Sequence, residues 1–214
     1  MRTASIPRLS ATALVALRNV ELVPGASLAL VVRRHPDAAD VGAMLRLLLG
    51  RLTGRPPESI QLEKTAEGKP WLAGCNIAFN LSHARGYSLM ALSSAGEIGC
   101  DIEDRFSDED VMGLGAPVLH ASELDAMRRL APWEQRAAFR RYWVRKEAVL
   151  KAAGTGFLRD PRLVVTGLDQ AHATFLGEQA PDFTIHDRQI EAGCLAAVAS
   201  MDAACNWRLL TDWA

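Results

Sequence analysis

The stretch "EIGCDIE", residues 97–103, decides the fold, because its residues alternate in character along the chain. Every second residue from Ile98 is apolar, which is the period of a strand that buries one face. Asp101 and Glu103 fall on the opposite face, so two carboxylates project side by side from a half-buried strand. An exposed edge strand would explain them, and so would a bound divalent cation that relieves their repulsion.

The composition is that of an ordinary globular protein. The chain has 214 residues, 49% of them hydrophobic, and a formal net charge of −1. This length allows one large domain or two small ones, and the charge gives no support to nucleic-acid binding. No apolar run approaches the roughly 20 residues needed to cross a bilayer, and the N-terminus lacks a convincing signal-peptide pattern. We therefore expect a cytoplasmic protein whose four cysteines are free thiols.

The periodicity predicts a mixture of helices and strands, an α+β fold. Apolar residues at three-to-four spacing predict a helix from Asp40 to a stop at Gly54. A longer helix is expected from Pro132 to Ala153. Residues 87–94 and 97–103 read as two strands around Ala95-Gly96, which predicts a hairpin, and further strand-like runs follow residue 160.

The long predicted helix carries a third acid on a defined face. Trp143, Glu147 and Lys151 follow one another at steps of four residues and therefore share that face. A surface ion pair beside a buried tryptophan would account for them. Alternatively, Glu147 joins the two strand carboxylates in holding Mg²⁺, a hard cation that often completes its shell with substrate phosphate.

A phosphate-bearing substrate should leave cationic and hydroxyl groups nearby. Lys69 lies in a glycine-proline turn, "GKP", and Ser82 and His83 end the stretch "FNLSH". Each has an ordinary explanation, as a solvated lysine, a turn hydroxyl or a capping histidine. Their combination with the acidic residues, in this order along the chain, favours a phosphate site.

Taken together, "GKP" (68–70), "FNLSH" (79–83), "IGCDIE" (98–103) and "WVRKEAVLKAAGTGF" (143–157) resemble the successive signatures of 4′-phosphopantetheinyl transferases. The similarity covers roughly residues 40–160 and is to the longer, surfactin-synthetase-activating type. It implies two similar α/β halves, 1–103 and 104–214, in a pseudo-twofold arrangement. Each half would have a small, mostly antiparallel sheet and a long helix, with the site at their interface.

The resemblance implies transfer of the phosphopantetheine arm of coenzyme A to a serine of an apo acyl or peptidyl carrier protein, releasing 3′,5′-ADP. By resemblance, Asp101, Glu103 and Glu147 coordinate Mg²⁺, or Mn²⁺ in its place. Glu147, directly or through a metal-bound water, would take the serine proton, and Lys151 would stabilise or protonate the departing phosphate oxygen.

The coenzyme A contacts implied by the resemblance lie in the first half of the chain, at Lys69, Pro70, Ser82 and His83, the last towards the 3′-phosphate. The N-terminal third departs from the family pattern, since "RRHPDAAD" is short and has no aromatic residue. Candidates for the missing charge there are Arg33, Arg34 and Arg46.

The partner surface is suggested by the charge of residues 128–151, which hold eight basic residues against two acids. These basic residues are Arg128, Arg129, Arg136, Arg140, Arg141, Arg145, Lys146 and Lys151. They suit an acidic carrier protein of fatty-acid, polyketide or nonribosomal-peptide synthesis, although a solvated helix face explains many of them equally well. We expect a monomer with no nucleic-acid or membrane partner.

Two other functions use the same residues. A nucleotide pyrophosphatase would keep the metal and phosphate chemistry but use water as acceptor, and it would release 3′,5′-ADP without any carrier. A non-catalytic relative would only bind carrier proteins, which leaves the acidic trio and Lys151 unexplained.

Overall fold

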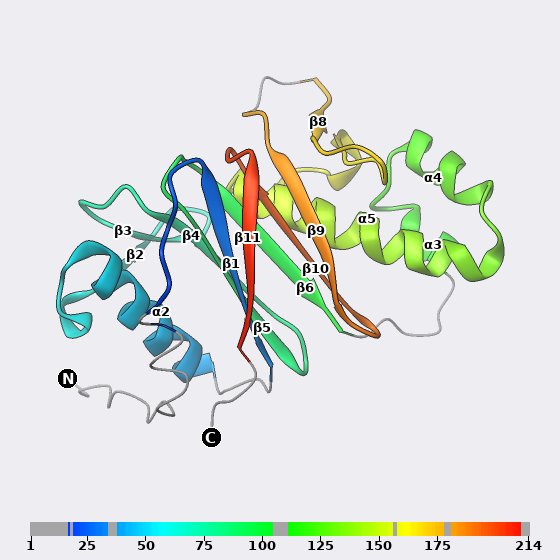
Figure 1. Ribbon diagram of the computed structural model, residues 1–214. Coiled ribbons are helices and arrows are strands. Elements are labelled where there is room, and N and C mark those ends of the chain that lie inside the picture. The colour runs from blue at the N-terminus through cyan, green and yellow to red at the C-terminus, as the bar shows by residue number, and fades with distance from the viewer. Residues whose placement is uncertain are drawn as a thin grey trace.

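The chain folds into two β-sheets that pack face to face, with one long helix on each outer side (Figure 1). This computed structural model describes residues 17, 19–33, 38–104, 111–155, 158–177 and 181–210, without the side chains of 38–40. Among the described helices none is long and apolar enough to span a membrane. The fold is thus a mixed α+β architecture, as the sequence predicts.

The first sheet has four strands in the order β11-β1-β5-β4. Their bounds are Ala204–Leu210, Ala26–Arg33, Tyr87–Ser93 and Ala78–His83. β1 runs parallel to β11, whereas the β1–β5 and β5–β4 pairs are antiparallel. Helix α2 (Ala38–Thr53) covers its outer face, where Leu28 and Leu30 of β1 pack with Leu45 and Leu48 of the helix.

The second sheet has three antiparallel strands in the order β6-β10-β9, with bounds Ile98–Glu103, Cys194–Ser200 and Thr184–Glu191. Helix α5 (Pro132–Ala152) crosses its outer face, and Val144 and Ala148 pack there against Ala197 and Ala199 of β10. The predicted helix over residues 132–153 is confirmed to within one residue at its end.

The inner faces of the two sheets share one apolar cluster. Ile98, Cys100 and Ile102 of β6 lie in it with Val31 of β1 and Val198 of β10. The alternation seen in the sequence is therefore confirmed: the apolar face of β6 points between the sheets, and its acidic face points outward to α5.

The predicted hairpin between residues 87–94 and 97–103 is wrong, although both strands are present. β5 pairs with β1 and β4 in the first sheet, whereas β6 pairs with β10 in the second. The turn at Ala95-Gly96 therefore carries the chain from one sheet to the other. The C-terminal strand β11 makes the reverse crossing and joins the first sheet beside β1. Each sequence half thus contributes its last strand to the sheet of the other half.

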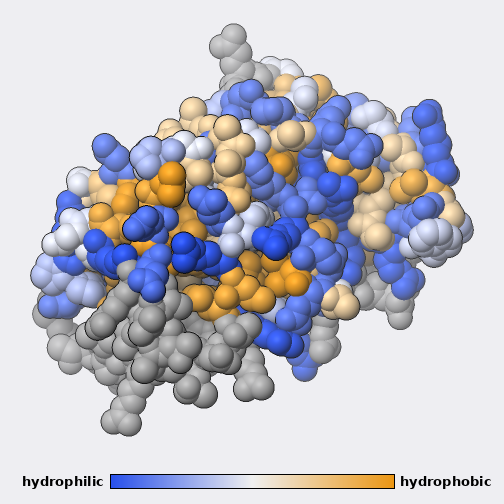
Figure 2. Space-filling model, viewed as in Figure 1, coloured by the Kyte–Doolittle hydropathy of each residue, from blue (hydrophilic) through white to orange (hydrophobic). Residues whose placement is uncertain are grey.

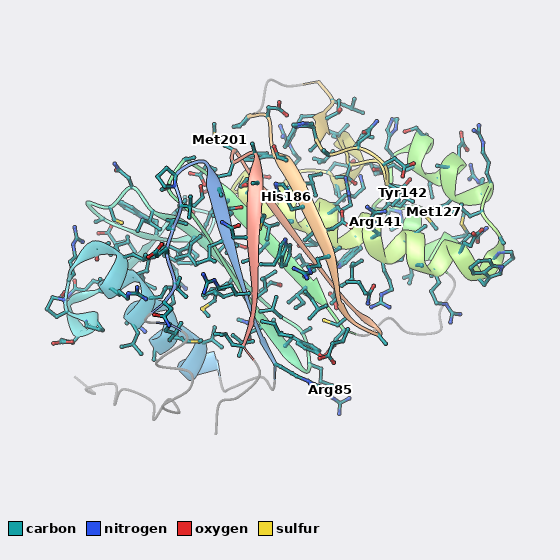
Figure 3. All side chains as sticks on the ribbon, viewed as in Figure 1. Arg85, Met127, Arg141, Tyr142, His186 and Met201 are labelled. Atoms are coloured by element: carbon teal, nitrogen blue, oxygen red, sulfur yellow. The ribbon has the colours of Figure 1, made fainter. Side chains whose placement is uncertain are left out.

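Shorter elements complete the fold around the two helices. Helix α4 (Ala121–Arg128) packs on the first half of α5 through Met127 and Tyr142 (Figure 3). The other short elements are η1 (Pro57–Ser59), β2 (Leu62–Lys64), β3 (Pro70–Leu72), α3 (Val111–Gly115), η3 (Pro161–Leu163), β7 (Val164–Val165) and β8 (Thr174–Phe175). On the face seen in Figure 2, hydrophilic side chains interrupt the hydrophobic ones over the strands.

Candidate active site

The candidate site lies where α5 crosses β6, and Gly99 makes that crossing close. A Cβ at Gly99 would stand 2.1 Å from the Ala148 carbonyl oxygen and 2.2 Å from the Ala152 nitrogen, both helix backbone atoms. Only glycine fits such an approach. The glycine therefore brings the acidic face of β6 directly against the helix turns that carry Glu147 and Lys151.

Lys151 joins the strand to the helix at this point. Its Nζ lies 2.7 Å from Oδ1 of Asp101 and 3.8 Å from Oε2 of Glu147. The Ser82 hydroxyl on β4 donates to the same Asp101 oxygen at 2.8 Å and lies 3.4 Å from Nζ. Burial lowers the pKa of Lys151, but the Asp101 carboxylate outweighs this and leaves the pKa raised. Lys151 therefore carries its positive charge within a group of oxygen atoms.

The three acids predicted to hold a metal influence one another's ionisation. The pKa of Glu147 is raised to about 7, mainly by burial and also by Asp101 and Glu103, against the lowering effect of Lys151. Burial and Asp101 likewise raise the pKa of Glu103, although a hydrogen bond from Trp143 opposes this. Three carboxylates from two elements thus share one small region, and their negative charges repel.

Asp101 is 5% exposed, which rules out the explanation of an acidic pair on an exposed strand face. Its Oδ2 is buried and has no hydrogen-bond partner. Among the described residues, no three acidic, histidine or cysteine side chains are arranged so as to surround a metal ion. The ammonium of Lys151 instead contacts Asp101 Oδ1. The unpartnered Asp101 oxygen and the mutual repulsion of the three acids fit a hard divalent cation, which would satisfy the one and relieve the other.

Asn80 is a site residue that the sequence reasoning missed. It lies on β4, and its Oδ1 accepts the backbone N–H of Cys100 at 3.0 Å. β4 and β6 are the adjoining edges of the two sheets, so this bond joins the strand of Ser82 to the strand of Asp101. An asparagine inside a strand is unfavourable on propensity, and that was the available signal.

Lys69 lies at the other end of β6, close to the end of α5. Its Nζ contacts Oε2 of Glu97 at 2.5 Å and donates to the Ala152 carbonyl at 3.1 Å. The next residue, Pro70, begins β3, which pairs with β2. The turn before β3 is thereby fixed to both elements of the candidate site. Glu97 was not predicted, and an exposed acid before a strand gives no signal.

The remaining predicted coenzyme A contacts are spread more widely. His83 ends β4 one residue after Ser82 and is exposed. Arg33 ends β1 and pairs with Glu191 at 3.3 Å. Arg46 lies on α2 and donates to the Gly42 carbonyl of its own helix at 3.3 Å. Arg34 lies outside the described residues.

Two of the cations assigned to a carrier-binding surface are buried, which corrects that assignment. Lys146 is 1% exposed and pairs with Glu123 of α4 at 2.7 Å, and it also donates to the Pro161 and Val164 carbonyls. Arg145 is 2% exposed and bonds to Asp187 of β9 and the Thr166 carbonyl.

Glu123 also accepts the Thr166 N–H at 2.9 Å. Because Arg145 and Lys146 donate to backbone carbonyls of residues 161–170, they hold this segment onto α5. Arg141, labelled on α5 in Figure 3, is partly exposed. It pairs with Asp187 at 2.7 Å. All three side chains brace the helix that carries Glu147, but only Arg145 and Lys146 are withdrawn from a partner by burial.

Comparison with known proteins places this site in a family. Residues 97–205 match the family model of the 4′-phosphopantetheinyl transferase superfamily, and this region contains Asp101, Glu103, Glu147 and Lys151. The chain is 30% identical to 4′-phosphopantetheinyl transferase HetI of Nostoc sp. strain PCC 7120, over 73% of this chain and 67% of that protein.

It is 39% identical to 4′-phosphopantetheinyl transferase AcpT of Salmonella typhimurium, over 51% of this chain and 56% of that protein. It is 30% identical to the mouse L-aminoadipate-semialdehyde dehydrogenase-phosphopantetheinyl transferase, over 59% of this chain and 45% of that protein. The matches thus span about half to two thirds of these relatives. The chain belongs to the 4′-phosphopantetheinyl transferase superfamily.

Proposed function

We propose that this protein transfers the 4′-phosphopantetheine arm of coenzyme A to a serine of an apo acyl or peptidyl carrier protein and releases 3′,5′-ADP. The observation that carries the proposal is the contact of Lys151 with Asp101 at 2.7 Å and with Glu147 at 3.8 Å. Acids from a strand and a helix far apart in the sequence therefore reach one point, as the reaction requires.

Asp101, Glu103 and Glu147 would hold Mg²⁺ or Mn²⁺. The unpartnered Oδ2 of Asp101 and the mutual repulsion of the three acids support this assignment. The bound ion would contribute a fixed positive charge opposite the pyrophosphate of coenzyme A. Through the ion, the three acids would fix the position of the coenzyme A pyrophosphate relative to β6.

The group transfer forms one bond and breaks one. The serine oxygen attacks the β-phosphorus, and the bond from that phosphorus to the bridging oxygen breaks, leaving the electron pair on 3′,5′-ADP. Glu147 would receive the serine proton, directly or through a metal-bound water. Lys151 would donate a hydrogen bond to the departing phosphate oxygen.

Contacts to coenzyme A remain predictions for Lys69, Pro70, Ser82 and His83, the last towards the 3′-phosphate, and for Arg33, Arg34 and Arg46. Ser82 has the most direct support, because its hydroxyl already contacts Asp101 and approaches Lys151. Lys69 is held by Glu97 and the Ala152 carbonyl, so its position is set before a donor binds.

Several finer features belong to the same proposal. We assign the chain to the longer family type, with its two halves related by a pseudo-twofold axis. The exchange of β6 and β11 between the sheets supports such an arrangement. We also expect a cytoplasmic monomer, and four free cysteines suit a reducing compartment.

The test is mass spectrometry of several apo carrier proteins incubated with this protein, coenzyme A and Mg²⁺. We expect one carrier serine to gain the mass of phosphopantetheine, with release of 3′,5′-ADP. Glu147→Gln should abolish the gain, whereas Glu63→Gln, the same change at an exposed strand position, should not. Release of 3′,5′-ADP without any carrier would instead establish a pyrophosphatase. A Glu147→Gln variant with full activity would refute the catalytic assignment.

A further inference from the structure

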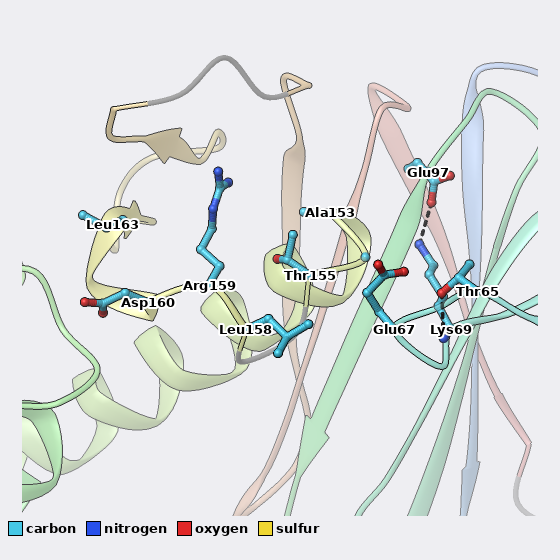
Figure 4. A pocket seen from close by; sticks show the side chains of 11 residues that line it. Thr65, Glu67, Lys69, Glu97, Ala153, Thr155, Leu158, Arg159, Asp160 and Leu163 are labelled. Atoms are coloured by element: carbon cyan, nitrogen blue, oxygen red, sulfur yellow. Dashed lines mark hydrogen bonds and ion pairs between the residues drawn. The ribbon is translucent and has the colours of Figure 1, made fainter.

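The edge of the two sheets opposite the candidate site is also hollowed. At the candidate site β4 and β6 adjoin, and a pocket of about 640 Å³ lies beside the Lys69–Glu97 pair (Figure 4). At the opposite edge, β9 of the second sheet lies beside β11 of the first (Figure 1). Pockets of about 470 Å³ and 150 Å³ lie there, and Arg188 of β9 and Trp207 of β11 line both. We call these two pockets the β9 groove, and the proposed transfer chemistry gives it no role.

The edge of strand β9 forms one side of this groove. Residues 185–188 line the larger pocket and residues 188–190 line the smaller one, without a gap. Successive side chains of a strand point to opposite faces, so an unbroken run of lining residues marks the backbone edge itself. Residues 207–209 of β11 line the other side. The groove therefore lies between two strand edges that pair, on this side, with no other strand of the described residues.

The outer edge of β9 is hydrogen bonded only at its start. Residues 171–173 bridge residues 183–185 through two backbone hydrogen bonds, one of them from the Ile185 N–H at 2.6 Å. The register with β10 is regular as far as Gln189, so the N–H and C=O groups of Asp187 and Gln189 point to the same side as those of Ile185. Among the described residues, no backbone group bonds to them on that side. The edge is thus open from Asp187 onwards.

The groove carries an excess of positive charge. Four arginines line it against two aspartates, which leaves two positive charges: Arg141, Arg145, Arg188 and Arg208 against Asp169 and Asp187. Asp187 pairs with both Arg141 and Arg145. Arg188 and Arg208 are exposed, and neither has an acidic partner within the described part of the chain. An acidic partner would be attracted, whereas a second copy pairing through the same edge would bring like charges together.

Apolar surface lies beside this charge. Trp207 and Ile190 are partly buried against the apolar cluster between the sheets, and Leu209, two residues further along β11, is 45% exposed. The Asp187 side chain lies on the other face of β9, where it meets Arg141 of α5. A strand added to this edge would have one face over Trp207 and Leu209 and the other towards Arg141. Its side chains should therefore alternate between apolar and acidic.

We propose that the edge of β9 beyond Ile185 docks an extended acidic segment of a protein partner, which adds to the second sheet as a further strand. Backbone hydrogen bonds to Asp187 and Gln189 supply affinity, and acidic side chains meet Arg141 and Arg188. β10 separates β9 from β6, so the docked segment leaves the candidate site open. The groove thus gives the protein a contact with a partner that does not depend on the transfer chemistry.

The probe is a blocked peptide as long as β9, 8 residues, in which glutamate alternates with valine. A second peptide has lysine in place of glutamate, and a third is methylated at every backbone amide, which prevents strand pairing. Binding of each to the full chain would be measured by calorimetry, and exchange of the Asp187 and Gln189 amide protons by NMR. We expect only the acidic, unmethylated peptide to bind with a Kd below about 1 mM, less tightly as salt is raised, and to slow both exchanges.

Gln189→Pro tests the backbone edge, because proline removes the outward N–H and leaves the bonds to β10 in place. Gln189→Ala is the matched control, since both variants lose the side-chain amide that bonds to the Cys194 carbonyl, but alanine keeps the N–H. The proline variant should bind the acidic peptide about three- to tenfold more weakly than the alanine variant, the value of one hydrogen bond. Arg188→Gln should weaken binding about two- to fivefold, the value of an exposed ion pair. Arg129→Gln, at the exposed end of α4, should leave it unchanged.

Urea unfolding of each variant shows whether the fold is intact, and if Gln189→Pro unfolds, Arg188→Gln and the methylated peptide still test the inference. Equal binding of the lysine or the methylated peptide would overturn it, and so would equal binding by folded Gln189→Pro and Gln189→Ala. No binding up to about 1 mM would show that the arginines only keep the edge from pairing with other chains. A dimer that Gln189→Pro converts to a monomer in sedimentation would place a second copy at the edge and overturn the inference too.

Discussion

Gly99→Ala is the sharpest test of how the fold builds the site. The added Cβ would lie 2.1 Å from the Ala148 carbonyl oxygen, and ordinary contact begins at 3.4 Å. The opposing atoms are helix backbone and cannot swing aside as a flexible side chain could. The helix α5 must therefore move away from β6 by about 1.3 Å, the difference between these two distances.

A shift of that size acts directly on the candidate site. It would stretch the 2.7 Å contact between Lys151 and Asp101 towards 4 Å, beyond hydrogen-bonding distance. Misplacement of catalytic groups by about 1 Å costs on the order of 10²-fold in rate. Overpacking of a core contact costs about 1–3 kcal/mol in the free energy of unfolding, and a clash with helix backbone should fall at the upper end.

The assay is carrier modification by mass spectrometry, with urea unfolding to measure the folded fraction under the same conditions. Gly42→Ala provides a matched control on α2, since its Cβ would meet only an Arg46 side-chain nitrogen at an ordinary 3.6 Å. That variant should keep its activity and gain up to about 1 kcal/mol from helix propensity. A Gly99→Ala protein with wild-type rate and stability would refute the reasoning about the β6–α5 contact.

Three further predictions concern groups around this contact. Without added metal, wild type should lose thermal stability between about pH 5 and pH 8, because the folded chain disfavours ionisation of Glu147, whose pKa is raised to about 7. Glu147→Gln should remove most of that loss, and an equally steep loss in the variant would contradict the assignment. Lys146→Met leaves the buried Glu123 carboxylate unpaired and should cost about 3–5 kcal/mol in urea unfolding; a loss below about 1 kcal/mol would show that the pair is unimportant. Asn80→Ala leaves the Cys100 N–H without its partner and should cost about 1–3 kcal/mol, with slower carrier modification by the protein that remains folded. Unchanged stability and rate would show that this bond does not hold the two sheet edges together.

Much of the site could be predicted because its signals are local. Alternation along residues 97–103 is a property of the strand itself, and it correctly placed the Asp101 side chain away from the apolar core. The four-residue step from Glu147 to Lys151 is likewise fixed by the helix period. Both patterns hold whatever the sheets pair with, and so they were confirmed.

Pairing and burial depend on the rest of the chain, and local patterns failed there. Residues 87–94 and 97–103 have the turn and alternation of a hairpin, yet β6 finds its partner in β10, nearly 100 residues later. From the sequence, Arg145 and Lys146 look like surface cations. Their burial is stabilised by the carboxylates of Glu123 and Asp187 and by backbone carbonyls of residues 161–170. The sequence of the helix alone does not indicate contacts with residues so distant in the chain.

The three cations of the 145–151 turns show how burial separates structural from chemical roles. Arg145 and Lys146 each bond to at least one backbone carbonyl and one carboxylate. A backbone carbonyl can move only with its whole segment, so these two contacts are not released when a substrate binds. Among the described residues, Lys151 contacts only side chains, those of Ser82, Asp101 and Glu147. Its acidic partners, Asp101 and Glu147, repel each other. A divalent cation bound beside them would replace the positive charge of Lys151, so Lys151 could leave these carboxylates without any helix or strand unfolding. Of the three, Lys151 is therefore the cation able to turn from its protein partners to a phosphate oxygen during a reaction.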